Sequence, residues 1–185
     1  SNTTRSYYRT VNATTGTLVM ASSPDGTAGS QVSGTSSAAP TVSDGQAIWL
    51  RVTLDVNDGS GNRVYKFYTA ADSDTVPTSW SQLGTTQTVA GATTIHDNAS
   101  VVEIGSVIAG TAQVAAGNVY RALIYSGFSD AGGTLKVDFN PDRDASDAST
   151  SFASSATGET WTVNSSGGLP AQIVGRSSIL FDGTA

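Results

Sequence analysis

The chain has 185 residues, a net charge of −6 and a pI near 4.4, and only 13% of its residues are charged, against ~25% in an average soluble domain. The nine basic residues are scattered, which argues against the concentrated basic patch that a nucleic-acid or anionic membrane surface requires. Cysteine is absent, which rules out disulfides and thiolate chemistry. No apolar run approaches the ~20 residues of a membrane-spanning helix, so neither nucleic-acid binding nor membrane insertion is expected.

Two short strands are predicted at residues 7–11 and 17–21, on either side of a turn. The sequence SSPDG at residues 22–26 predicts a second turn, because Pro fixes φ and Gly accepts a positive φ. Residues 27–44 are rich in Ser, Gly, Thr and Ala, with almost no large apolar side chain. We expect them to form either a long surface loop or a strand paired at a sheet edge.

The clearest pattern in the chain lies at residues 47–71. Aliphatic residues from Ile48 to Val56 alternate with Trp49, Arg51, Thr53 and other residues, which predicts a strand with one buried and one wet face. Residues 57–62, NDGSGN, tolerate positive φ and allow the chain to reverse. Alternation then resumes, and the whole stretch is predicted to be a β-hairpin.

Further strands are predicted along the rest of the chain, and no window of twelve residues has helical spacing. Residues 72–78 are expected to be a loop, and residues 85–100 are polar and small. Leu135, Val137 and Phe139 interleave with Lys136 and Asp138, which predicts a half-buried strand. The other strands are expected at residues 80–83, 101–108 and 119–126, near residue 152, and at 161–163, 173–174 and 179–181.

About a dozen short strands separated by Gly, Ser and Asp turns predict an all-β fold, a two-sheet antiparallel sandwich of jelly-roll type. A chain of this length can form one sizeable core, so we expect residues 1–185 to be a single β-sandwich domain. Because the chain opens without Met and almost directly on a strand, we also expect it to be a segment of a longer polypeptide.

Two stretches resemble a known family. They are residues 44–84, with WLRVTLD followed by FYT and SW, and residues 117–168, with VYRALIY, VDF, TSF and TGETWTV. Their order is similar to that of the concanavalin A-like lectin/glucanase (laminin-G-like) domains of tail and structural proteins of actinobacteriophages. The resemblance implies a concanavalin A-like jelly roll and a place on a virion.

That fold also includes glucanases, which hydrolyse glycosidic bonds. This hydrolysis needs two carboxylates close together, often alternating on one strand. The two glutamates do not fit: Glu103 has no acidic residue two positions away, and Glu159 lies in a predicted turn. No catalytic residue is therefore assigned, and we expect the protein not to be an enzyme.

The aspartates favour turn chemistry over metal binding. Residues 55–59, DVNDG, resemble a calcium loop, but the glycine comes one residue early and no bidentate Glu follows. The loop PDRDASDAS, residues 141–149, is the better metal candidate by charge density. His96 is the only histidine and is expected to be a solvated loop residue. No metal site and no cofactor are predicted. The loop acids are Asp25, Asp58, Asp72, Asp74, Asp142, Asp144 and Asp147.

The tryptophans are the remaining candidates. Trp49 lies on the polar face of its strand, so it either packs under a loop or is exposed, and an exposed indole could stack on a sugar ring. Trp49 is therefore the candidate carbohydrate-binding residue. For Trp80 and Trp161 a structural role is favoured, with each ring packed over its own turn.

These patterns predict a non-enzymatic structural protein of a phage virion, in the tail or on the capsid surface, with a lectin-like domain. Expected partners are other virion subunits, including copies of this chain, together with a host cell-surface glycan. Flat Ser/Thr-rich surfaces with little charge suit subunit packing. The alternatives are a carbohydrate-binding module of a secreted bacterial protein and a glycoside hydrolase.

Overall fold

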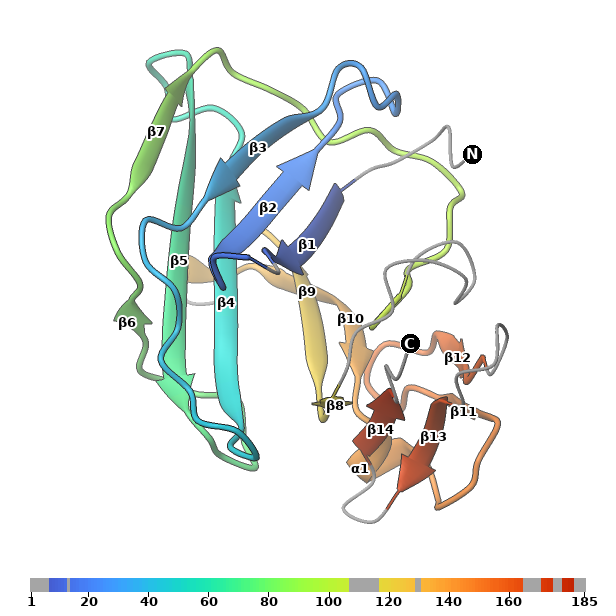
Figure 1. Ribbon diagram of the computed structural model, residues 1–185. Coiled ribbons are helices and arrows are strands. Elements are labelled where there is room, and N and C mark those ends of the chain that lie inside the picture. Colours follow the sequence, from blue (N-terminus) through green and yellow to red (C-terminus); the bar gives the residue numbers. More distant parts are fainter. Residues whose placement is uncertain are drawn as a thin grey trace. The chain divides into compact units, whose positions relative to one another are not determined.

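The computed structural model describes residues 7–12, 14–106, 117–128, 131–164, 171–174 and 178–181 (Figure 1). These residues form fourteen strands, paired antiparallel in several small sheets, and one four-residue helix. The described residues are thus mostly β, and their strands pair antiparallel as predicted. Residues Ser1–Ser100 and Val101–Ala185 form two compact units, and the single domain remains a prediction. In the described part of the chain, no helix is long and apolar enough to cross a membrane.

The first sheet of residues 1–100 has the order β1-β2-β3, with β1 at Tyr7–Val11, β2 at Leu18–Ser22 and β3 at Val32–Thr35. The turn before β2 is closed by Asn12, whose Oδ1 accepts the backbone N–H groups of Thr14 and Thr15. β3 comes from the Ser- and Gly-rich stretch and lies at the edge of the sheet. Of the two predictions for residues 27–44, the paired edge strand is therefore right for its middle part.

The predicted central hairpin is confirmed. β4 (Ile48–Asp55) and β5 (Asn62–Ala71) pair without a register shift, from Ile48↔Ala71 to Asp55↔Val64. The turn is built by its acids: Asp55 accepts the N–H of Asn57, and Asp58 accepts those of Ser60 and Asn62. Asp55 and Asp58 thus act as turn residues, as the sequence favoured.

Two short strands pair with the other edge of β5. They are β6 (Ser81–Gln82), which was predicted, and β7 (Gln87–Ala90), which was not. β7 lies in the polar stretch 85–100 and has one large apolar residue, Val89, which packs against the core. Its four residues are too polar for the alternation to be recognised.

The two sheets of residues 1–100 meet over one core. Leu18 and Met20 of β2 are buried with Tyr65 and Phe67 of β5, and β4 contributes its aliphatic row to the same cluster. The sheets approach so closely at Gly34 of β3 that a Cβ there would lie 2.4 Å from the ring of Tyr65. Only glycine fits this position without displacing the ring.

The described residues between 101 and 181 form three further sheets, which have the orders β10-β9, β11-β12 and β13-β14-β8. The helix α1 (Pro141–Asp144) follows β10 and is capped by Asn140, whose side chain accepts the N–H of Arg143. The strands are β8 (Gly117–Val119), β9 (Ala122–Ser126), β10 (Thr134–Phe139), β11 (Ser151–Ala153), β12 (Thr160–Thr162), β13 (Ala171–Val174) and β14 (Ser178–Phe181).

Two strand predictions in this unit are wrong. The strand expected over residues 119–126 is interrupted at Tyr120 and Arg121, and its parts, β8 and β9, belong to different sheets. Residues 101–106 form no strand, and residues 107–108 lie outside the described residues. Val101 is 80% exposed, and only Ile104 of this stretch packs against the core. Residues 101–106 alternate as a strand would, but they pair with no other strand in the described part of the chain.

The core of this unit is aromatic. Phe139 of β10 and Phe152 of β11 are buried with their ring centroids 5.7 Å apart. Trp161 of β12 meets Phe139 edge-on at 5.1 Å, a favourable arrangement of two rings. The structural role predicted for Trp161 is thus supported, and β10, β11 and β12 are held together by these three rings.

Candidate binding surface

The side chain of Trp49 lies on the face of β4 that is turned away from the core. Leu50, Val52 and Leu54 pack against the buried cluster, and successive side chains of a strand point to opposite faces. Trp49 therefore shares its face with Arg51, and the register adds Tyr68 of β5 directly opposite Arg51. All three side chains are half-buried.

Trp80, which precedes β6, completes this group. Its ring meets that of Trp49 edge-on, with centroids 6.5 Å apart and planes at 88°. The guanidinium of Arg51 lies 5.1 Å from the centroid of Tyr68 and 5.6 Å from that of Trp80, within the range of cation–π attraction. We refer to Trp49, Arg51, Tyr68 and Trp80 as the aromatic face.

Hydrogen bonds to the loop between β5 and β6 fix both indoles. Nε1 of Trp49 donates to the carbonyl oxygen of Ser73, and Nε1 of Trp80 donates to that of Pro77, each at 3.0 Å. Trp80 is thus packed over its own turn, as predicted. Trp49 lies against the loop and remains partly exposed, so the structure combines the two alternatives for this residue.

The aromatic face combines apolar ring surface with a fixed cation. Ring surface can stack on the C–H groups of a sugar, and the guanidinium places a positive charge beside that surface. Trp49 was identified from the sequence, whereas Arg51 and Tyr68 were not. The sequence could have indicated both residues. Arg51 is two positions from Trp49 and so lies on the same face of the strand, and the hairpin register pairs Arg51 with Tyr68.

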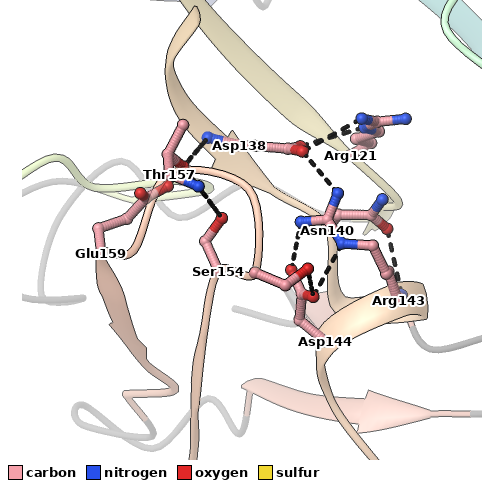
Figure 2. A network of polar contacts seen from close by, with 9 residues as sticks. Arg121, Asp138, Asn140, Arg143, Asp144, Ser154, Thr157 and Glu159 are labelled. Carbon is pink, nitrogen blue, oxygen red and sulfur yellow. Dashed lines mark hydrogen bonds and ion pairs between the residues drawn. The ribbon is translucent and has the colours of Figure 1, made fainter.

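A network of polar side chains surrounds Asp138 of β10 (Figure 2). Its carboxylate is 1% exposed and accepts two bonds from Arg121, both at 3.2 Å, and one from Arg143 at 2.8 Å. Its backbone N–H donates to Oε1 of Glu159 at 2.9 Å. Alternation had predicted that Asp138 lies on the polar face with Lys136. It is buried instead, because two arginines neutralise its charge.

Two acids of this cluster, Asp144 and Glu159, have lowered pKa values. Arg143 also donates to both carboxylate oxygens of Asp144, at 2.8 and 2.5 Å, and this pairing keeps the pKa of Asp144 below its usual value. The pKa of Glu159 is also lowered: partial burial opposes this, but bonds from Thr157 and from the N–H of Asp138 outweigh it. A glycosidase acid needs a raised pKa. The contacts of this cluster therefore stabilise the fold.

Two other candidates are also placed by the structure. His96 lies in a loop, as predicted, but its ring is half-buried against Gly26, and its backbone N–H donates to the carbonyl oxygen of Ser23 at 2.9 Å. The His96 ring is thus only partly solvated. Glu103 lies in the non-strand stretch 101–106.

The predicted loop 141–149 begins with α1, where Asp144 is paired with Arg143. No group of three His, Cys, Asp or Glu side chains among the described residues could hold a metal ion. Asp25 is another turn acid: a bond from Ser30, followed by bonds from Thr27 and Ser23, holds its pKa below the usual value. Asp144 and Asp25 are therefore each bound by residues close to them in the sequence, as expected of turn acids.

No protein-family model, no curated protein and no solved structure matches this chain.

Proposed function

We propose that this chain is a non-enzymatic structural protein of a phage virion, located in the tail or on the capsid surface, whose aromatic face contacts glycans of the host surface. In this proposal the chain folds as a concanavalin A-like jelly roll, and the small antiparallel sheets form its layers. The proposal is also supported by the resemblance of residues 44–84 and 117–168 to the concanavalin A-like domains of actinobacteriophage tail and structural proteins.

The aromatic face is the observation that carries the glycan part of this proposal. Four side chains from β4, β5 and the segment before β6 are fixed by stacking and by the bonds to Ser73 and Pro77. Binding to rings that are already ordered costs less conformational entropy than binding to mobile side chains. A pyranose ring would stack on the exposed part of the Trp49 ring.

Two features support the structural and non-enzymatic part. The buried carboxylate of Asp138 and the neighbouring Asp144 are engaged with arginines, so they do not form a proton-donating pair. The chain is also poor in charge and rich in Ser and Thr, and such a surface loses little hydration energy when subunits pack against it.

Virion placement is tested by mass spectrometry of purified particles. The proposal expects peptides of this chain in particles that remain after density-gradient purification, in a constant ratio to the major capsid protein. Their absence from purified particles would refute virion placement.

Glycan contact is tested by binding of the purified protein to host cell-wall polysaccharide. Trp49→Ala should weaken binding at least tenfold, which corresponds to ~1.4 kcal/mol. Tyr120→Ala removes an exposed aromatic side chain outside the aromatic face and is the matched control, which should bind as the wild type does. Equal binding by Trp49→Ala and wild type, with both folded by circular dichroism, would contradict the assignment of Trp49.

A carbohydrate-binding module of a secreted bacterial protein is the second candidate, and the same aromatic face favours it. Detection of the chain in culture supernatant of uninfected bacteria, joined to a hydrolase domain, would favour this candidate over the virion protein.

A further inference from the structure

The two indoles of the aromatic face do not form two parallel platforms. Their ring planes stand at 88° to each other, with centroids 6.5 Å apart. A sugar stacks on an aromatic side chain by laying one face of its ring flat on the face of the indole. Two adjoining pyranose units of one extended chain therefore need two aromatic rings in nearly the same plane, and Trp49 and Trp80 do not provide them.

Hydrogen bonds hold both rings in this orientation. Nε1 of Trp49 donates to the carbonyl oxygen of Ser73, and Nε1 of Trp80 donates to that of Pro77. Trp80 also directly precedes β6, which pairs with β5, so the sheet fixes the backbone on one side of it. Turning either indole into the plane of the other would break its N–H bond and the edge-on contact.

Trp49 is the better platform of the two rings. The guanidinium of Arg51 lies over the ring of Trp80, 5.6 Å from its centroid, and also over the ring of Tyr68. A sugar on that face of Trp80 would have to displace a cation–π contact. The residue directly opposite Trp49 is Ala70, whose methyl group covers little of an indole, and Trp49 is partly exposed.

We infer that the aromatic face binds a single pyranose unit, at a chain end or a side branch of a glycan. Trp49 is the platform, and Trp80 is the positioning residue that sets the angle of its ring. The inference rests on the proposed glycan contact and adds the class of ligand, because it excludes a groove that follows an extended polysaccharide. Since no second ring takes part in stacking, a longer oligosaccharide should bind no more tightly than a short one.

Isothermal titration calorimetry with sized fragments of host cell-wall polysaccharide tests this inference. Fragments of two, four and six sugar units should bind the wild type with dissociation constants that agree within about threefold, the statistical gain from more positions on a longer chain. Trp49→Ala should weaken the binding of every fragment at least tenfold. Trp80→Phe keeps an aromatic edge beside Trp49 and should bind every fragment within about threefold of the wild type.

The outcomes separate this inference from the proposed function. A gain in affinity of tenfold or more from the two-unit to the six-unit fragment, with both lost in Trp49→Ala, would overturn the one-unit site and leave glycan contact intact. Equal binding by Trp49→Ala and the wild type would refute the role of Trp49. Failure of the wild type to bind any fragment would refute the glycan contact and the one-unit site together.

The fixed orientation of Trp80 is tested without any glycan. The chain has three tryptophans, so the double variant Trp49→Phe with Trp161→Phe retains Trp80 as its single indole. Its time-resolved fluorescence anisotropy should lack a dominant fast component of ring motion, which exposed side chains show on the picosecond to nanosecond timescale. A dominant fast component in a variant that is folded by circular dichroism would overturn the inference, because a ring that turns freely can become coplanar with its neighbour.

Discussion

Replacing Asp138 by Ala removes the buried acceptor of three N–H···O bonds. The side chains of Arg121 and Arg143 are 20% and 35% exposed, whereas that of Asp138 is 1% exposed. Breaking a fully buried ion pair from one side costs about 3–5 kcal/mol. Both arginines reach water, and Arg143 keeps Asp144, so the expected loss of unfolding free energy is about 2–4 kcal/mol.

Urea unfolding followed by far-UV circular dichroism and by tryptophan fluorescence measures this loss. Asp142→Ala, an exposed acid in the same short helix, is the matched control and should change the free energy by less than about 0.5 kcal/mol. Asp138→Asn keeps the shape and one acceptor and should fall between the control and Asp138→Ala. A loss below about 1 kcal/mol for Asp138→Ala would refute this reasoning. It would mean that the cost of desolvating the carboxylate nearly cancels the stabilisation from its bonds to Arg121 and Arg143.

Two further predictions concern acid stability and the inter-sheet contact. The pKa values of Asp144, Asp58 and Glu159 are lowered in the folded state, so their stabilisation is present above the unfolded pKa of about 4 and is lost as the pH falls below it. Thermal melts should be nearly constant from about pH 7 to 5 and fall below about pH 4, with a shallower fall in Asp144→Asn; an equal slope in that variant would exclude Asp144 as a contributor. Gly34→Ala should cost about 1–3 kcal/mol because its Cβ meets the Tyr65 ring, whereas Gly29→Ala, with open space around it, should be tolerated; equal melting temperatures of the two variants would refute the close approach of the sheets.

The central hairpin could be predicted because two kinds of local information agree there. The aliphatic row of β4 has a period of two, and residues 57–62 supply the Asn, Asp and Gly residues that reverse the chain. β7 could not be predicted in this way, because its strand character depends on pairing with β5 rather than on its own four residues. The strand expected over 101–108 failed for the opposite reason, since its alternation is regular but finds no partner over the described residues 101–106.

At Trp49 and Asp138, too, local alternation could be read from the sequence, whereas contacts with distant residues could not. The position of Trp49 on the outer face follows from alternation, but its contact with Trp80 depends on how the loop between β5 and β6 folds back. The burial of Asp138 could not be predicted from alternation. Its polar side chain predicted an exposed position, whereas its burial requires Arg121 and Arg143, one seventeen residues earlier and one five residues later.

The contact of Gly34 with Tyr65 links two positions that are far apart in the chain. A mutation that enlarges the first is compatible with the fold only if the second becomes smaller, so naturally occurring variants of this protein should change at both positions together or at neither. In a sequence collection this would appear as correlated substitution between β3 and β5, and it would report the spacing of the two sheets without any coordinates.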